Sequence, residues 1–372
     1  MPPVRSGALT AGMHLPSTSR RRIDAVALAL LLLVLCWVID LRILGQPLLA
    51  EGRPLFDNPH LLRSLLLALA AGTLVWGFAV PDQAAGASGD WPRTPASATW
   101  PGPGRLLLAA LMIDLLFVAL FLISPQYYYK AGREDRPIED ASAMLLFASA
   151  ALMALSAWRL HRAKRQHGAW LVRGAVALAV AFLLIGMEEI SWGQRIFGIR
   201  SPEVFLEHNL QRETNLHNFV TDEAENAYYL GAFLLLTAWP FFVPRIPALA
   251  RQPMFAFFTA SEPLMVAAAL SAAFSYDLWN VSFTQFAFFC TVFILLATAW
   301  RRRHSNRSLA RWALLMAMIC VATQAAHLAF GYRTVRLWDV SEYKEFLVPF
   351  FLAAYAVEIL QRSGGGPESR AV

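Results

Sequence analysis

Charged residues are scarce in this chain. Asp, Glu, Lys and Arg make up only 16% of its 372 residues, whereas 57% are hydrophobic and the mean hydropathy is +0.45. A soluble domain cannot hide that much apolar surface in its interior, which excludes the ordinary soluble globular class. The alternating pattern of a transmembrane β-barrel is also missing, and helices are then the only way to satisfy the backbone in lipid. The sequence predicts an all-α, polytopic membrane protein.

Cysteine is rare as well. The chain has three cysteines, Cys36, Cys290 and Cys320, and all of them fall inside apolar segments, so no disulfide framework or CxxC metal site is expected. HExxH, GxSxG and Walker sequences are absent, and the first external loop lacks the paired acidic motif of lipid-linked sugar transferases. Any catalytic site has to be assembled from scattered residues.

Long apolar segments define the predicted architecture. About ten of them have roughly the 20 residues needed to cross about 30 Å of hydrocarbon. They cover residues 23–45, 61–80, 105–124, 141–158, 169–190, 224–243, 255–275, 281–300, 309–330 and 342–360. Arg20–Arg22 precede the first segment as in a signal peptide, but its long apolar run without a cleavage site predicts a retained helix. We expect one helix bundle at 23–361, with tails at 1–22 and 362–372.

The distribution of Lys and Arg predicts the orientation. These residues gather in alternate loops, which is typical of cytoplasmic loops in a bacterial inner membrane. Both termini and the flexible Pro-, Gly- and Ala-rich linker 81–104 would then be cytoplasmic. The opposite loops hold most remaining acidic residues and would face the periplasm. Because the net charge of +6 follows from this pattern, nucleic acid is not predicted as a partner.

The most polar stretch follows the fifth predicted span and forms the motif loop 188–223. Residues 186–218 read GMEEISWGQRIFGIRSPEVFLEHNLQRETNLHN. Glu188 and Glu189 either mark the edge of the membrane or line a water-filled pocket that opens outward. Beyond them, Ser201 as a cap and Pro202 at the first turn predict a short amphipathic external helix from Pro202 to about Asn218. One face of this helix would carry Asn209, Glu213 and His217, and the adjoining face His208, Gln211 and Asn215.

Several of these side chains are candidates for a catalytic site. Neighbouring carboxyls can exchange protons with a substrate, and the candidates for this role are Glu188, Glu189, Glu213 and, from the block WDVSEYKEF at 338–346, Glu342. A divalent metal ion is the candidate cofactor, with Glu189, His208, Glu213, His217 and Glu345 as candidate ligands. Spacing does not choose among Mg²⁺, Mn²⁺, Zn²⁺ and iron. The alternative is that these helices simply face water, with Glu342 favouring its helix dipole.

A substrate head group is the other expected ligand of this region. The candidates for binding it are Arg195, Arg212, Gln211, Asn215 and Trp192, because guanidinium groups fit phosphates and carboxylates. The arginines could equally neutralise the nearby acids. Deeper in the predicted spans, Asp114 must pair, lose its charge or line water, and His327 is either a hydrogen-bonded residue between helices or a ligand.

Three blocks of the sequence resemble a known group of proteins. EEISWGQRIFG (188–198), NLQRETNLHN (209–218) and SEYKEF (341–346) are similar to blocks in a family of uncharacterised bacterial polytopic membrane proteins. The resemblance implies that the three blocks belong together, and it carries no established activity.

Three functions fit these features. The first is a membrane enzyme at the outer leaflet that hydrolyses a lipid or lipid-linked substrate, or transfers a group from it, because polar residues of several spans gather on one side. The second is a transporter or channel, for which the polar residues within the spans would form the path. The third is a non-catalytic envelope assembly factor whose polar loop docks a partner.

Overall fold

The computed structural model describes residues 17–45, 49, 51–80, 102–133, 137–163, 168–209 and 212–364, with the side chains of Ser17, Thr18 and Arg195 excepted. Helices and the turns between them make up this part of the chain, and it contains no strand, as the sequence predicts. Most of the predicted tails and of the linker 81–104 lies outside these ranges.

The predicted spans in the first half of the chain are confirmed as helices to within a few residues. They are α1 (Ser17–Ile39) with its extension η1 (Asp40–Leu44), α2 (Asn58–Ala79), α3 (Pro103–Ile123), α5 (Pro137–Arg162) and α6 (Gly168–Glu189). Their starts follow local chemistry: the Asp57 side chain accepts a hydrogen bond from the backbone N–H of His60, and Pro59 occupies the first turn of α2. A short helix, α4 (Pro125–Ala131), follows α3.

In the second half of the chain, short helices between Arg245 and Ser282 interrupt the succession of long helices. One helical stretch, Thr221–Arg245, is built from α9 (Thr221–Phe233), η4 (Leu234–Ala238), α10 (Trp239–Phe242) and η5 (Val243–Arg245), and α11 (Pro247–Ala250) follows it. After the interruption come α14 (Ser282–Arg302), α15 (Arg307–Phe330), η7 (Gly331–Arg333) and α16 (Ser341–Gly364).

Among the described residues, eight helices are long and apolar enough to cross a membrane, which indicates a multi-pass membrane protein. The other two predicted spans are 342–360, which lies within the 24-residue helix α16, and 255–275. A single helix over 255–275 is wrong. The chain there forms α12 (Pro253–Phe258), a break, then α13 (Glu262–Ala268) and η6 (Ala269–Ala273).

The break has a local cause. Ser261 has an extended backbone, and its side chain accepts a hydrogen bond from the N–H of Leu264, while Pro263 fits the first turn. This chemistry starts a new helix and cannot continue the old one. The resulting helical segment is shorter than the others and lies in the centre of the bundle, where Leu264, Met265 and Leu270 are fully buried.

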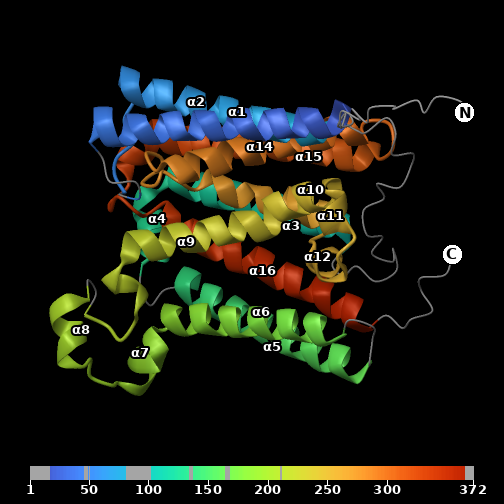
Figure 1. The fold of residues 1–372 in the computed structure, drawn as a ribbon. Coiled ribbons are helices and arrows are strands. Elements are labelled where there is room, and N and C mark those ends of the chain that lie inside the picture. The colour runs from blue at the N-terminus through green and yellow to red at the C-terminus, as the bar shows by residue number, and fades with distance from the viewer. Residues whose placement is uncertain are drawn as a thin grey trace, which may run out of the picture.

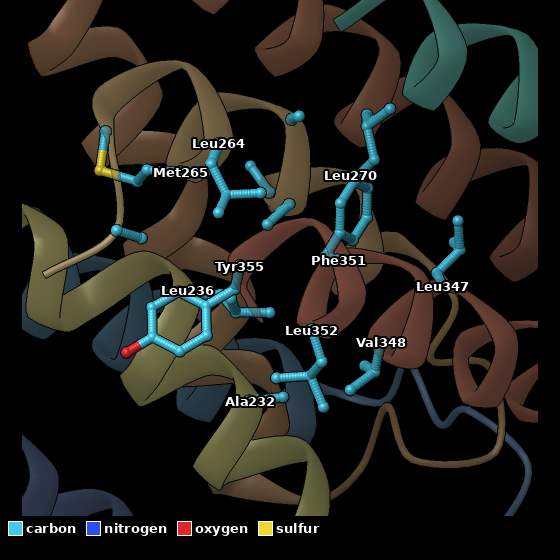
Figure 2. Close-up of a cluster of buried hydrophobic side chains, with 14 of the residues drawn as sticks. Ala232, Leu236, Leu264, Met265, Leu270, Leu347, Val348, Phe351, Leu352 and Tyr355 are labelled. Carbon is cyan, nitrogen blue, oxygen red and sulfur yellow. The ribbon is translucent and has the colours of Figure 1, made fainter. Parts of the chain in front are cut away.

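Figure 2 shows how this central segment is packed. Leu264, Met265 and Leu270 lie close to side chains of α16, and Ala232 and Leu236 of the Thr221–Arg245 stretch complete the cluster. The α16 side chains in this cluster are Leu347, Val348, Phe351, Leu352 and Tyr355. Figure 1 places α1 and α2 on one side of the bundle and α5 and α6 on the opposite side, with α16 running between α5 and the remaining helices.

The two ends of the bundle differ in charge. At the end that we call the basic end, Arg21, Arg301 and Arg362 donate hydrogen bonds to backbone carbonyls, and Arg302 pairs with Glu262 at 2.7 Å. The opposite end, which we call the acidic end, is the end where α6 finishes and α9 and α16 begin. Acidic residues at this end include Glu51, Glu188, Glu189, Glu225, Asp277, Asp339, Glu342 and Glu345.

One ion pair ties α1, α2 and α14 together. Arg63 of α2 donates a hydrogen bond to Asp40 at 2.8 Å, and the hydroxyl of Ser282 donates another to Asp40 at 2.6 Å. Both charged side chains are almost completely buried. Removal of one partner would leave the other charge unpaired in an apolar environment.

We therefore predict that Asp40→Ala lowers the free energy of unfolding by about 3–5 kcal/mol, the typical cost of breaking a buried ion pair. The double variant Asp40→Leu/Arg63→Met should recover most of this loss, because it removes both charges and keeps the volume filled. Thermal unfolding in detergent measures both. A double variant as unstable as Asp40→Ala would show that the ion pair is not the reason.

Candidate functional site

The chain after α6 turns sharply. Ser191, Trp192 and Gly193 have positive φ angles of 47°, 56° and 78°, and the short helices α7 (Gln194–Phe197) and α8 (Glu203–His208) follow. We call residues 190–220 the Glu188 loop. The predicted helix from Pro202 to about Asn218 is wrong in length, because it ends at His208.

The helix stops for a local reason. Asn209 has an extended backbone, and its side-chain amide donates to both the carbonyl and the side chain of Asn215 at 2.8 Å. Arg212 has a φ of 59°, which no helix accommodates. Asparagine side chains that bond to nearby backbone compete with helix formation. Asn209, Glu213 and His217 therefore do not share a helix face, and His217 lies in η3 (His217–Phe219).

Glu188 holds this loop against the end of α6. Its carboxylate accepts hydrogen bonds from the indole N–H of Trp192 at 2.6 Å and from the backbone N–H groups of Leu216 and His217 at 2.6 and 3.0 Å. The His217 ring nitrogen Nδ1 lies 3.3 Å from the same carboxylate. A carboxylate with several donors is strongly held, so Glu188 fixes both the start and the end of the loop.

A second network fills the middle of the loop. Ser191 donates a hydrogen bond to Glu213, and the Asn215 amide donates to Ser191 at 3.2 Å. The side chain of Gln194 accepts from the N–H of Thr214 at 2.6 Å. Ser191 and Asn215 are buried, so the polar groups of the loop point inward.

A different set of acidic residues gathers beside the loop, and we call it the carboxyl cluster: Glu51, Asp222, Glu225, Asp277 and Glu345. These residues come from the segment before α2, from α9, from the segment before α14 and from α16. The carboxyls of Glu51 and Glu225 lie next to each other. Two neighbouring carboxyls can form a hydrogen bond only when one of them is protonated.

Lys344 is a buried cation next to this cluster. Its side chain is buried and donates a hydrogen bond to the hydroxyl of Ser275 at 2.9 Å, and its Nζ lies 4.4 Å from the centre of the Tyr229 ring. Tyr229 in turn donates to Glu345 at 3.0 Å. One Oδ of Asp277 accepts from Ser341 at 2.9 Å, and the other has no hydrogen-bond partner among the described residues.

Glu189 connects the two regions. Unlike its neighbour Glu188, it lies within electrostatic reach of Glu345 and Glu139. Glu342 also lies near Glu189 and Glu345. It accepts a hydrogen bond from Arg336 at 2.9 Å. The structure thus brings Glu189, Glu342 and Glu345 together, and keeps Glu188, Glu213 and His217 in the loop network.

A pocket lies between the helices next to this cluster. Its cavity volume is only ≈ 30 Å³, which is room for about one water molecule, and it is partly open to the outside. Side chains of α9, η4, η6, α14 and α16 form it. Asn226, Tyr229 and Lys344 supply polar groups to its wall. Much of the remaining wall is apolar and includes Phe233, Phe283, Phe288 and Val348. Polar and apolar side chains are mixed in its wall: Thr284 and Thr291 lie on α14 with Phe283 and Phe288, and Lys344 is one turn from Val348 on α16. A space of this size admits only a small group of a ligand.

Comparisons of the chain with known protein families, with curated proteins and with solved structures find no match. The resemblance of the three sequence blocks to a bacterial membrane protein family therefore stays a prediction. Any function proposed for this chain therefore rests on the geometry of the site.

The other predicted site residues have varied surroundings. His208 is exposed, with Glu207 at 3.8 Å as its acidic neighbour. Arg212 is also exposed, and its backbone carbonyl accepts from the hydroxyl of Ser201 at 2.6 Å. Gln211 and the side chain of Arg195 lie outside the described part of the chain. The catalytic and binding roles of all these residues stay predictions.

The predicted metal ligands are not gathered around one point. Within the described ranges, no three His, Cys, Asp or Glu side chains are arranged to hold a metal ion. Glu213 and His217 belong to the loop, whereas Glu189 and Glu345 face the carboxyl cluster. Metal binding stays a prediction, with carboxylate oxygens as the donors that this region offers.

Sequence reasoning missed Glu225, Tyr229 and Lys344 as parts of the site. Lys344 gave a usable signal, because a lysine next to an apolar stretch needs a partner. Deeper in the bundle, Asp114 accepts a hydrogen bond from Thr323 at 2.9 Å, and the His327 Nδ1 lies 3.1 Å from the carbonyl of Ala273. Both are buried and connect neighbouring helices.

The anchoring role of Glu188 leads to a prediction. Glu188→Ala removes an acceptor of several hydrogen bonds, each worth roughly 1.5–3 kcal/mol when one partner is charged. The Glu188 loop should then open more often, and trypsin should cut at the exposed Arg200 and Arg212 at least about tenfold faster. The control is Glu203→Ala, which changes an exposed residue of α8. Equal digestion of both variants would contradict the anchoring role.

A second prediction concerns pH. Burial raises the pKa of Glu51 to about 8, with a further contribution from Asp277, and burial raises the pKa of Asp277 to about 6. An unfolded carboxyl titrates near about 4. Between these values the folded protein holds more protons than the unfolded chain, so the free energy of unfolding should fall as the pH rises from about 4 to about 8.

Glu51→Gln keeps the shape and removes the titration. Thermal unfolding at pH 5 and pH 8 should therefore show a smaller decline for this variant than for the unmodified protein, with Glu203→Gln as the matched control. If the unmodified protein were equally stable at both pH values, the buried carboxyls would have to be ionised throughout.

Proposed function

We propose that this protein is an integral-membrane enzyme whose catalytic centre is the carboxyl cluster and whose substrate is a lipid or lipid-linked molecule. The observation that carries the proposal is the pocket next to the cluster. Its lining contains Tyr229, which donates to Glu345, and Lys344, together with the apolar side chains of Phe283, Phe288 and Val348. In this proposal only the head-group linkage of an amphiphile enters the pocket, beside Tyr229 and Lys344, and its chain stays in the surrounding lipid.

The chemistry that this arrangement supports is general acid and base catalysis. In hydrolysis, Glu345 takes a proton from water while the water oxygen forms a bond to the carbon or phosphorus of the head-group linkage. The bond from that atom to the leaving oxygen breaks, and a protonated carboxyl such as Glu225 gives its proton to the leaving oxygen. Carboxyls that share protons supply both a donor and an acceptor. In group transfer, a hydroxyl of a second substrate replaces the water.

The remaining predicted residues have supporting roles in this proposal. Glu188 and Glu213 position the loop, and Glu189 and Glu342 extend the cluster. A divalent metal ion bound by carboxylates of this region would lower the pKa of a bound water. Because basic residues gather at the other end of the bundle, we orient the acidic end toward the outside of a bacterial inner membrane.

The interruption before α13 favours a second candidate function, transport. Transporters often bind their substrates where a helix is broken, and Asp114 is buried within the bundle with one oxygen that lacks a partner among the described residues. Flux across proteoliposomes that depends on Asp114 and not on Glu345 would favour this candidate.

We predict that the purified protein, in liposomes of a total bacterial lipid extract, converts one class of lipid, which mass spectrometry identifies. Glu345→Gln should reduce the rate by about 100-fold or more, since loss of a general base typically costs that factor. Glu203→Gln, with its change at an exposed position, should stay within about twofold of the unmodified rate. A lipid composition that changes no faster than in protein-free liposomes would contradict the proposal.

A further inference from the structure

The Glu188 loop buries several of its polar groups and exposes several large apolar side chains. Ser191, Asn209 and Asn215 are buried in the loop network. Large apolar side chains are exposed instead, including Ile196, Phe197, Ile199, Val204, Leu206 and Leu216. A loop that only contacts water normally shows the reverse arrangement, so this surface marks a contact with something apolar.

The two most exposed of these side chains lie in one turn together with Ile199. Ile196 and Phe197 end α7, and Ile199 follows after Gly198, with exposed fractions of 68%, 75% and 57%. Gly198 has a φ of 61°, which reverses the chain after α7 and lets the three side chains project from a compact tip. We call Ile196–Ile199 the α7 tip.

The position of the α7 tip indicates that it lies at the membrane surface. The loop leaves one candidate span at Glu189 and enters the next at Thr221, so both of its ends lie at the level where the spans end. Figure 1 shows α7 beside the ends of α5 and α6, at the periphery of the bundle, whereas α8 lies farther out. At that level the bilayer changes from hydrocarbon to head groups, which is where amphipathic segments bind.

The charges around the tip agree with this position. Arg200 directly follows the tip and is exposed, as is Arg212. Glu203 and Glu207, one turn apart, place the acidic face of α8 away from its partly buried Phe205. Basic residues next to inserted apolar side chains suit the phosphates of lipid head groups, and acidic ones suit water.

We propose that the α7 tip inserts Ile196, Phe197 and Ile199 into the boundary between the head groups and the acyl chains, with Arg200 at the lipid phosphates. The loop then has a fixed depth in the membrane and holds Glu188 and Glu189 just below its surface. This inference does not depend on the proposed enzymatic activity.

Spin labels test the depth directly. The native cysteines Cys36, Cys290 and Cys320 are buried, so a nitroxide reagent should label only an introduced cysteine. Labels at Phe197→Cys and Ile199→Cys in lipid nanodiscs should collide more often with oxygen than with a water-soluble nickel complex. A label at Glu207→Cys, the matched control on α8, should show the opposite order.

Two results would overturn the proposal. Collisions dominated by the nickel complex at 197 and 199 would place the tip in water. Exclusion of both reagents would show that protein covers it, either a second copy of the chain or another partner.

The role of Arg200 has its own test with the label at Ile199→Cys. Nanodiscs that contain anionic phospholipid should increase the ratio of oxygen to nickel collisions relative to purely zwitterionic nanodiscs. Arg200→Gln should remove this increase, while Glu203→Gln should not. An increase that persists in Arg200→Gln would overturn the assignment of this arginine to the phosphates.

Discussion

Burial of charge in an apolar bundle is the constraint on which the rest of this structure depends, because an unpaired charge in such surroundings is costly. Several of the buried charges satisfy this constraint by pairing one to one. Asp40 pairs with Arg63, Glu262 with Arg302, and Glu358 with Arg362. The carboxyl cluster differs, since several acids lie near one buried cation, Lys344. Burial of these acids favours their protonated form, and we propose that they share protons and can exchange them with a substrate.

The adjacent residues Glu188 and Glu189 connect this cluster to the loop. Neighbouring side chains on a helix point about 100° apart, so two successive glutamates at the end of α6 face different surroundings. Glu188 binds backbone N–H groups of the loop, whereas Glu189 faces Glu345 and Glu139. A shift of the loop would therefore move Glu188, and with it the adjacent Glu189 and its distance to Glu345 in the cluster. The proposed membrane contact of the α7 tip would in turn set the height of both glutamates.

Much of the fold follows from the sequence, because long apolar helices are set by local composition. The segment 255–275 was predicted as one helix since its hydropathy is high throughout, yet Ser261 and Pro263 start a new helix there. The helix predicted from Pro202 to about Asn218 was too long for a related reason. Its polar residues have the four-residue spacing of a helix, but the Asn209 side chain bonds to Asn215 and the helix ends there. The pairing of Glu188 with His217 was within reach of sequence reasoning. The sequence does signal that Lys344 needs a partner. The association of Glu51, Glu225 and Lys344 was not within reach, because it depends on how distant helices pack.

The shared protons of the carboxyl cluster are the central claim, and infrared spectroscopy measures them most directly. A protonated carboxyl in an apolar environment has a carbonyl stretch that is well separated from that of a carboxylate. At pH 7 the purified protein should show this band, and it should weaken in a variant in which Glu225 is replaced by Gln. A spectrum at pH 7 without any band from protonated carboxyls would contradict the account.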